Sequence, residues 1–169
     1  ITNGILVNDR IAQKLNSLKL ASITVSIDGL KKNHELIRGK DSFERAIRGI
    51  ETLKRCVTTA KLSMRVTVNT QNVGDCPELI SLAEELGVQS IRLTPVLLLG
   101  RVVENQYLLL SQEQYLQFLV DCHTVEAKTE IALPDDKPDP KTLKPGEFGR
   151  HCGREVCWIT QTGKMYPCI

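Results

Sequence analysis

Three of the six cysteines lie close together near the end of the sequence, in the stretch HCGREVCWITQTGKMYPCI over residues 151–169. Thiolates are the usual ligands of iron–sulfur clusters, and mixed sets of cysteine and histidine often hold structural zinc. The segment between Cys152 and Cys168 predicts two short strands joined by a turn at Gly163, because glycine readily adopts a positive φ. A hairpin of this kind is one way to hold two thiolates at one site, so the stretch is a candidate metal centre.

Residue types alone leave the identity of this centre open. Two or three thiolates are too few for a stable four-coordinate site, so we expect further ligands beyond residue 169. A zinc site built from His151, Cys152, Cys157 and Cys168 is an alternative, although spacings of four and ten residues are not those of a zinc finger. A disulfide between the first and the last of these cysteines is another.

A second group of polar residues follows the segments that we expect to be strands. Asn3 and Asp28 come directly after two of these segments, Asn69 is the last residue of a third, and Ser26 lies near the end of the second one. In parallel α/β folds, ligands bind where strands end and loops begin. These side chains can therefore converge on one ligand. The alternative is that they only form turns after strands, as such residues commonly do.

The elements that would position these residues alternate between strand and helix. The predicted strands cover residues 20–27, 62–69 and 88–96, with a remnant at residues 1–2, and the predicted helices cover residues 8–17, 41–55, 76–86 and 111–125. Single helices between strands indicate parallel pairing through crossover connections. We therefore expect an α/β fold with a barrel-like or open sheet, in which four strand–helix units are present rather than eight.

Local signals mark the ends of two predicted helices. Asp41 or Ser42 suits the cap of the helix over residues 41–55, and the position of a capping-box glutamate holds Arg45, so the cap stands alone. Pro77 suits the first turn of the next helix, and Gly87 suits its C-terminal end.

The composition is that of one globular domain with the start of another. The hydrophobic share is 41%, the charged share 25% and the net charge +2. Residues 134–150 hold four of the seven prolines and predict a linker between a domain over residues 1–133 and a module over residues 151–169. Interspersed charges with few aromatic residues argue against a nucleic-acid partner, and no apolar run approaches the length of a bilayer.

We expect the other three cysteines to be small buried side chains rather than partners in disulfides; they are Cys56, Cys76 and Cys122. Reduced thiols favour a cytoplasmic protein. The sequence opens on ITNGILVNDR, with neither an initiating methionine nor the basic and apolar regions of a signal peptide. We therefore expect a piece cut from a longer chain.

Several motifs follow one another in a recognisable order. They are TNG, VSIDG followed by NHELIRGKDSFERAIRGI, RVTVNTQN, IRLTPVLLLGR and a terminal C-x10-G-x4-C that ends in MYPC. This order resembles radical S-adenosylmethionine enzymes of the SPASM type, and within them peptide and cofactor maturases such as coenzyme PQQ synthesis protein E and the anaerobic sulfatase-maturating enzymes. The resemblance implies the later part of a partial TIM-like (β/α) barrel, followed by a Cys-rich β-hairpin that begins a SPASM extension.

The resemblance also implies where S-adenosylmethionine would bind. By the family's pattern, Ser26 and Arg38 lie near its ribose and carboxylate, Asp28 and Asn69 line the same face, and Asn3 is a weaker candidate. A guanidinium can hold a carboxylate through two parallel hydrogen bonds, and a hydroxyl can bond to ribose or carboxylate oxygens. In the alternative, Asp28 forms a turn, Arg38 is a solvated charge and Asn69 caps a strand end.

The implied iron–sulfur clusters fall partly outside the sequence. The family's C-x3-C-x2-C loop, which holds a 4Fe-4S cluster, does not occur in these 169 residues. We therefore expect the fragment alone to be inactive in S-adenosylmethionine cleavage and to bind neither S-adenosylmethionine nor a 4Fe-4S cluster. Cys152 and Cys168 match the first ligands of an auxiliary cluster, and Cys157 is an extra thiol that is a further candidate.

The favoured function is that of a radical S-adenosylmethionine oxidoreductase or maturase acting on a peptide or small cofactor precursor. Two alternatives belong to other classes: a non-catalytic α/β module that binds a peptide, and a structural zinc-binding fragment. An aldolase-type barrel ranks last, because no confidently predicted strand end offers the lysine that Schiff-base chemistry requires. A partial barrel also leaves a sheet edge exposed, which dimerisation could cover.

Overall fold

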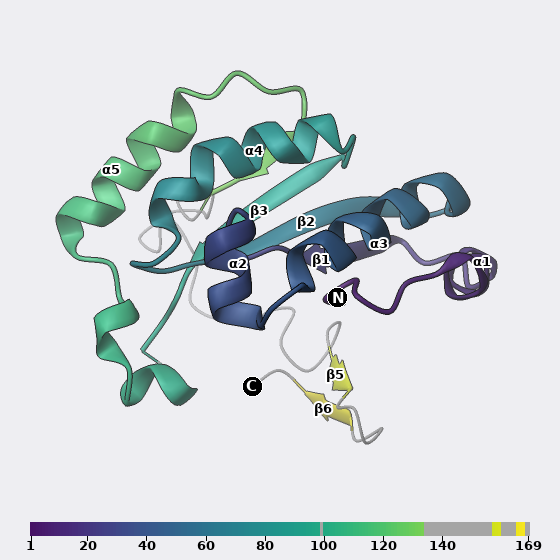
Figure 1. The fold of residues 1–169 in the computed structure, drawn as a ribbon, viewed down its shortest axis with the longest axis horizontal. Helices are drawn as coiled ribbons and strands as arrows, with labels where there is room; N and C mark the ends of the chain where they lie inside the picture. The colour runs from purple at the N-terminus through teal and green to yellow at the C-terminus, as the bar shows by residue number, and fades with distance from the viewer. Residues whose placement is uncertain (99, 134–156, 160–164, 168–169) are drawn as a thin grey trace, which may run out of the picture. The chain divides into compact units, whose positions relative to one another are not determined.

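A computed structural model describes residues 1–98 and 100–133 with their side chains, and residues 157–159 and 165–167 as backbone strands. The chain divides into two compact units, Ile1–Pro134 and Asp135–Ile169. The first unit contains a four-stranded sheet and five α-helices among its described residues (Figure 1).

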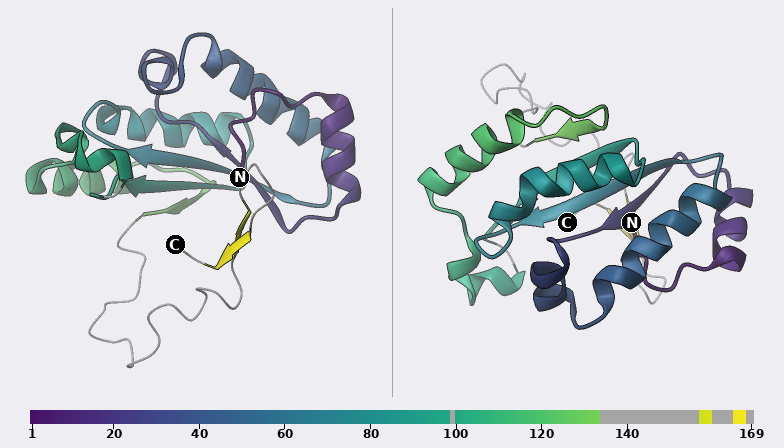
Figure 2. Two further views of the ribbon diagram at one scale, coloured as in Figure 1. Left: turned by 90° about the horizontal axis from the view of Figure 1, so that it is seen from below. Right: turned by 45° about the horizontal axis from the view of Figure 1, so that its top comes forward.

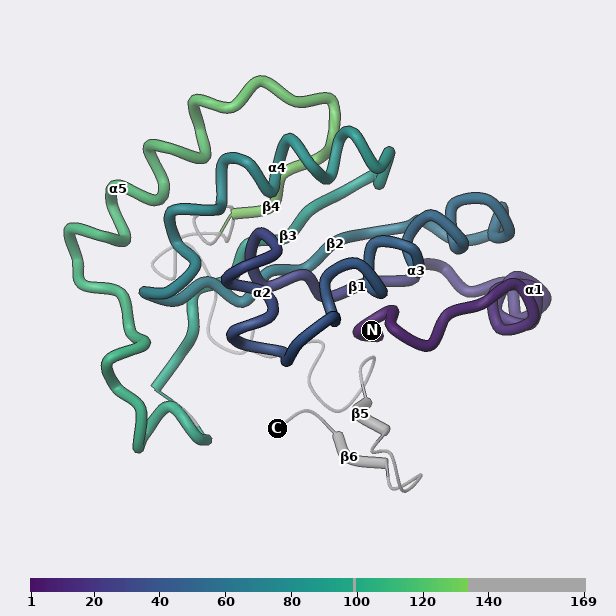
Figure 3. The backbone as a smooth tube through the Cα atoms, in the orientation of Figure 1, coloured from purple at the N-terminus to yellow at the C-terminus, as the bar shows by residue number. Residues whose placement is uncertain are grey.

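Strands and helices alternate along the first unit, as the tube in Figure 3 shows. The strands are β1 (Ser22–Ser26), β2 (Lys61–Val68), β3 (Ser90–Pro95) and β4 (Glu130–Ala132). The α-helices are α1 (Asp9–Ser17), α2 (Lys31–Arg38), α3 (Ser42–Cys56), α4 (Cys76–Glu85) and α5 (Gln112–His123). Short 3-10 turns cover η1 (Val73–Asp75), η2 (Gly100–Val103) and η3 (Gln106–Leu108).

The sheet has the strand order of a barrel segment. All three strand pairs are parallel, and the spatial order β1-β2-β3-β4 repeats the order along the chain. Thr2 adds a parallel bridge to Val25 at the free edge of β1. Each strand thus lies beside its predecessor, whereas the order reverses in a doubly wound sheet. The expected α/β fold with a partial TIM-like barrel is confirmed.

Alternation along the strands gives the sheet two different faces. One face is apolar and packs beneath the helices, which all lie on one side of the strands (Figure 2). Its core includes Val25, Met64, Val66, Ile91 and Leu93 from the strands, all almost fully buried. We call the opposite side the polar face; it carries Ser22, Thr24, Ser26, Lys61, Ser63, Arg65, Thr67, Ser90, Arg92 and Thr94. Burying one face and hydrating the other explains why strands rich in serine and threonine remain stable in this sheet.

The loop after Thr2 packs tightly against α3. A Cβ atom on Gly49 would lie 2.2 Å from the carbonyl oxygen of Gly4, so only glycine fits at that point of the helix. Gly4 itself has a φ of +74°, a conformation that side chains disfavour. This contact fixes the start of the chain beside β1.

Two predicted helix signals are confirmed, and a third is confirmed in its position but not in its hydrogen bond. Pro77 lies in the first turn of α4, and Gly87 follows its end with a φ of +68°. At the start of α3, Asp41 occupies the N-cap position as predicted, but its side chain makes no capping hydrogen bond. Asp41 adopts a left-handed conformation, and the Ser42 hydroxyl instead donates to the carbonyl oxygen of Gly39 at 2.6 Å.

Two elements were not anticipated from the sequence. The helix α2 has eight residues, of which only His34 is buried, so it lacks an apolar stripe. The strand β4 has only three residues, too few to show alternation. Dimerisation through an exposed sheet edge remains a prediction.

The described part of the second unit is an antiparallel pair of short strands. β5 (Cys157–Ile159) pairs with β6 (Met165–Pro167), as expected for a β-hairpin. The predicted linker over residues 134–150 and the turn at Gly163 lie outside the described residues. Over the described part of the chain, no helix has the length and apolarity that crossing a membrane requires.

Candidate functional site

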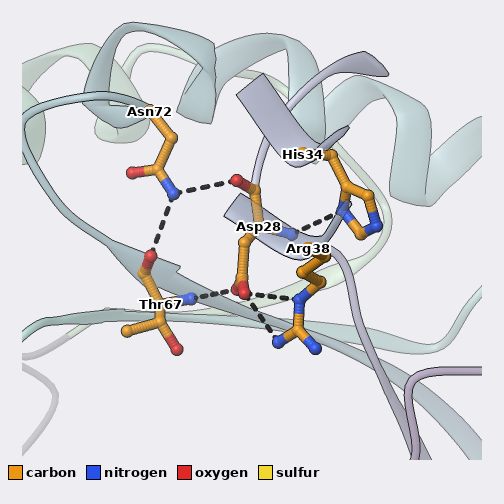
Figure 4. Close-up of polar contacts among 5 residues, drawn as sticks. All are labelled: Asp28, His34, Arg38, Thr67 and Asn72. Atoms are coloured by element: carbon orange, nitrogen blue, oxygen red, sulfur yellow. Dashed lines mark hydrogen bonds and ion pairs between the residues drawn. The ribbon is translucent and has the colours of Figure 1, made fainter. Parts of the chain in front are cut away.

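The loop after β1 holds a carboxylate within a set of hydrogen bonds (Figure 4). Asp28 is 4% exposed, and its Oδ1 accepts from the backbone N–H of Thr67 on β2 at 2.8 Å. Its own backbone N–H donates to Nδ1 of His34 on α2 at 3.1 Å, and its carbonyl oxygen accepts from Nδ2 of Asn72 at 3.0 Å. Segments far apart in the sequence thereby meet at one residue.

Arg38, in the last turn of α2, pairs with the same carboxylate. Its Nε and Nη2 atoms both lie 2.6 Å from Oδ2 of Asp28. Such charge-assisted bonds are short and strong, and they fix the plane of the guanidinium. The remaining nitrogen, Nη1, has no partner among the described residues, and 30% of the side chain is exposed. Arg38 therefore keeps donors for a ligand while Asp28 holds it in place.

His34 lies buried beside this pair and acts as an acceptor. Because Nδ1 accepts from the Asp28 amide, the proton of the neutral ring must be on Nε2, which has no partner within the described residues. Burial, and to a smaller extent the positive charge of Arg38, lowers the pKa of His34 to about 4. The ring of Phe43 packs against it edge-on, with 5.6 Å between centroids. His34 is thus neutral at pH 7 and can keep its bond to Asp28.

Asn72 ties the end of β1 to the end of β2. Its side chain is fully buried, and Nδ2 donates to the carbonyl oxygens of Asp28 and Thr67 at 3.0 and 2.9 Å. Its Oδ1 accepts from the backbone N–H of Asn69 at 2.7 Å. The Oδ1 of Asn69 in turn accepts from the N–H of Gln71 at 2.8 Å, so Asn69 shapes its own turn.

Asp75 anchors the start of α2 from the neighbouring loop. Its Oδ2 accepts from the backbone N–H of Leu30 at 2.8 Å, and Nδ2 of Asn33 donates to both carboxylate oxygens. Gly29 has a φ of +138°, and a Cβ atom there would lie 2.9 Å from the Cβ of Asn33. The turn into α2 therefore requires glycine, and the helix that carries Arg38 is held at both ends.

The other two predicted residues lie outside this network. Ser26 binds Thr2 through its backbone, and its hydroxyl lies on the polar face without a hydrogen bond to any described residue. Asn3 is exposed, and its Oδ1 accepts from the N–H of Ile5 at 3.3 Å in a local turn. The structure therefore joins Asp28 directly to Arg38, links Asn69 through Asn72, leaves the Ser26 hydroxyl open and gives Asn3 no connection.

Sequence reasoning missed three members of the network, namely His34, Thr67 and Asn72. A histidine four positions before Arg38 on one helix places both side chains on the same helical face, which was a usable signal. Thr67 contributes its backbone N–H, and because nearly every residue type has this group, the sequence gives no signal for it. Asn72 was visible only as part of a polar turn.

The candidate metal ligands lie largely outside the described residues. Cys152 and Cys168 are not described, and of Cys157 only its place in β5 is known. The cluster, zinc and disulfide alternatives therefore stay predictions. Where side chains are described, no group of three or more His, Cys, Asp or Glu residues could hold a metal ion.

Two of the other cysteines meet in the core, although they are far apart in the sequence. A hydrogen bond with the thiol of Cys122 raises the pKa of Cys76, and burial raises it further. Both are buried and free, as predicted, whereas Cys56 is only half-buried. A thiol with a raised pKa is a poor nucleophile, so Cys76 is a packing residue where α4 meets α5.

Comparison with known proteins relates the chain to one superfamily. Residues 1–83 match the family model described as Radical SAM superfamily. This segment includes Asp28, Arg38, His34, Thr67 and Asn72.

Curated relatives extend the similarity beyond that segment. The chain is 34% identical over 180 residues to mycofactocin maturase MftC of Mycolicibacterium smegmatis, covering 99% of this chain and 43% of that protein. It is 34% identical over 101 residues to Fe-coproporphyrin III synthase of Methanosarcina barkeri, covering 59% and 25%. It is 25% identical over 190 residues to AdoMet-dependent heme synthase of the same organism, covering 99% and 53%. The chain thus spans from a quarter to about half of the length of these relatives.

Proposed function

We propose that this chain, whose residues 1–83 match the Radical SAM superfamily, is part of an enzyme that cleaves S-adenosylmethionine to a 5'-deoxyadenosyl radical. The enzyme would be an oxidoreductase-type maturase, and the radical would abstract hydrogen from a peptide or a small cofactor precursor. Similarity to a mycofactocin maturase over 99% of the chain supports this choice. A resemblance to coenzyme PQQ synthesis protein E and to sulfatase-maturating enzymes belongs to the same proposal.

The observation that carries the proposal is the ordered Asp28–Arg38 pair inside the matched segment. Arg38 presents a free Nη1 beside the end of β1, and Ser26 presents a free hydroxyl on the same strand. These donors suit the carboxylate and ribose oxygens of S-adenosylmethionine. Asp28, His34 and Asn72 would orient Arg38 and touch no ligand themselves.

The iron–sulfur chemistry would be supplied mostly from outside these residues. A reduced 4Fe-4S cluster provides the electron that cleaves S-adenosylmethionine, but the sequence has no C-x3-C-x2-C spacing. In this proposal, its ligands come from another part of the whole protein. Cys152 and Cys168, with Cys157 as a further candidate, would be the first ligands of an auxiliary SPASM-type cluster.

A second candidate function is tetrapyrrole modification. It is favoured by the 34% identity to a protein named Fe-coproporphyrin III synthase and by the match to AdoMet-dependent heme synthases along nearly the whole chain. Both candidates use the same cofactor site and differ in the substrate alone.

The test is anaerobic reconstitution of the full-length protein with iron and sulfide. We expect bound iron, binding of S-adenosylmethionine and formation of 5'-deoxyadenosine after reduction. Arg38→Gln should weaken S-adenosylmethionine binding at least tenfold, whereas Arg45→Gln, an exposed position on α3, should leave it unchanged. Reconstituted protein that neither binds nor cleaves S-adenosylmethionine would instead support a non-catalytic binding module.

A further inference from the structure

The polar face carries two arginines side by side. Arg65 on β2 is the register partner of Arg92 on β3, so their Cα atoms lie on neighbouring parallel strands. Strands in such a sheet are about 4.8 Å apart, and both side chains project from the same face. The next partner in this row is Ser26 on β1, whose register partner is Arg65. Ser26, Arg65 and Arg92 therefore form one row across three strands, in which Arg65 is the direct neighbour of the serine that we assign to the cofactor site.

In the described part of the chain neither arginine is bonded to a carboxylate, although Arg92 acts on Glu130 at longer range: the bond from Lys61, and to a smaller extent the charge of Arg92, lowers the pKa of Glu130. No ion pair or side-chain hydrogen bond of Arg65 or Arg92 occurs within the described residues, in contrast to Arg38. Glu130 is the single acidic residue lining the pocket on this face, and its carboxylate binds Nζ of Lys61 at 2.5 Å. Like charges on paired strands destabilise a sheet, so this arrangement costs stability unless an anion joins it.

The surroundings of the pair suit a small anion. Both arginines line a pocket of about 270 Å³ on the polar face, together with the hydroxyls of Thr24, Ser63 and Ser90. The Ser90 hydroxyl donates to the Ser63 hydroxyl at 2.9 Å, and these two serines precede Arg65 and Arg92 by two positions on the same face of β2 and β3. A carboxylate placed there can accept from both guanidinium forks at once.

We propose that Arg65 and Arg92 bind a carboxylate group of the substrate. Arg38 and Ser26 offer donors for the carboxylate and ribose of S-adenosylmethionine, so the Arg65–Arg92 pair is a second anion site in the next position along the polar face. A substrate held there would lie beside the bound cofactor. The assignment of the carboxylate to a substrate rests on the proposed function, whereas the anion site rests on the strand register, on the shared pocket and on the absence of an ion pair to either arginine among the described residues.

Calorimetric titration of the full-length protein tests the site without cofactor or turnover. The probe is glutarate, a dicarboxylate, compared with glutaramide, its uncharged diamide, and with inorganic phosphate. We expect saturable glutarate binding and no glutaramide binding. The double variant Arg65→Gln/Arg92→Gln should bind glutarate at least tenfold more weakly. The matched variant Arg45→Gln/Arg48→Gln, which removes the same charge from exposed positions of α3, should bind it like the unchanged protein.

Several outcomes would overturn the proposal. Among them are no glutarate binding, equal binding by the two double variants, and tighter binding of phosphate than of glutarate through the same arginines. Displacement of glutarate by S-adenosylmethionine would assign the pair to the cofactor's own carboxylate. If the double variant does not fold, as judged by circular dichroism, Arg92→Gln alone serves, because Arg92 is exposed. Failure to cleave S-adenosylmethionine would leave glutarate binding intact and would remove only the substrate assignment.

Discussion

The two faces of the β1–β4 sheet are made by alternate residues of the same strands, yet they differ in what holds them. On the apolar face, the strand side chains belong to one buried core that also holds residues of α1, α3, α4 and α5. On the polar face, Thr24, Ser63 and Ser90 retain contact with solvent, and Arg65 and Arg92 form no ion pair with any described residue. The apolar face accounts for the stability of the fold, whereas the polar face carries charged and hydroxyl groups that the fold does not require.

The same contrast separates the arginines of the first unit. Arg38 is fixed by the buried carboxylate of Asp28, which also accepts from the backbone N–H of Thr67, while the backbone carbonyl oxygen of Asp28 accepts from Asn72. Arg65 and Arg92 are fixed only by the backbone of their strands. An arginine that is paired with a buried carboxylate has a fixed orientation. An arginine without an ion pair on the wall of a pocket is available to bind an anionic ligand.

The largest expected effect compares two neighbouring residues of β3 that face opposite ways. Ile91→Ala should lower the free energy of unfolding by about 2–5 kcal/mol, because it leaves a cavity at a fully buried position. Arg92→Ala should change it by less than about 0.5 kcal/mol, since the side chain is exposed. Urea unfolding followed by circular dichroism measures both. Equal losses would show that the polar face is also packed in the whole protein.

The next effect compares a buried ion pair with an exposed one. Asp28→Asn should cost about 2–3 kcal/mol of unfolding free energy, because it removes the charge that balances Arg38 and disturbs the bond to Thr67. The control is Asp9→Asn, whose partner Arg55 is 64% exposed, and it should change stability little. A small effect of Asp28→Asn would mean that the network does not order Arg38.

The pH dependence of stability isolates His34. Its pKa is about 4 in the folded chain and 6.5 when unperturbed, so between these values the unfolded chain binds a proton that the folded chain does not. Stability should therefore fall as the pH drops from 6.5 toward 4, by about 2 kcal/mol from this group. His34→Asn keeps an acceptor near the Asp28 amide but does not titrate. Its unfolding free energy should vary less over this interval, and an unchanged pH profile would contradict the assignment.

The smallest effect lies within the polar face itself. Ser63→Ala removes the hydroxyl that accepts from Ser90 and should cost less than about 1 kcal/mol, because water can satisfy the lost partner. Met64→Ala, at the next position of β2, removes a fully buried side chain and should cost more, about 2–5 kcal/mol. Thermal unfolding of both variants makes the comparison. A larger loss for Ser63→Ala would show that the polar face contributes to folding.

The sequence by itself determined the layout of the barrel segment. Alternation in LASITVSI and LSMRVTVN marks strands because one face must be buried, and single helices between strands require parallel pairing. Pro77 and Gly87 bound a helix for local reasons, since proline lacks an N–H group and glycine tolerates a positive φ. Asp28 and Arg38 were also found from the sequence, through the resemblance that placed both near one ligand.

Only the tertiary structure decided which of these residues meet. The bonds from Asp28 to Thr67 and Asn72 join positions far apart in the chain, and one of them uses a backbone N–H that has no sequence signature. The pairing of Arg65 with Arg92 depends on strand register, and a shift by one residue would turn either side chain into the core. Local sequence determines which side of an element is polar, whereas packing of the apolar side sets the register that brings polar groups together.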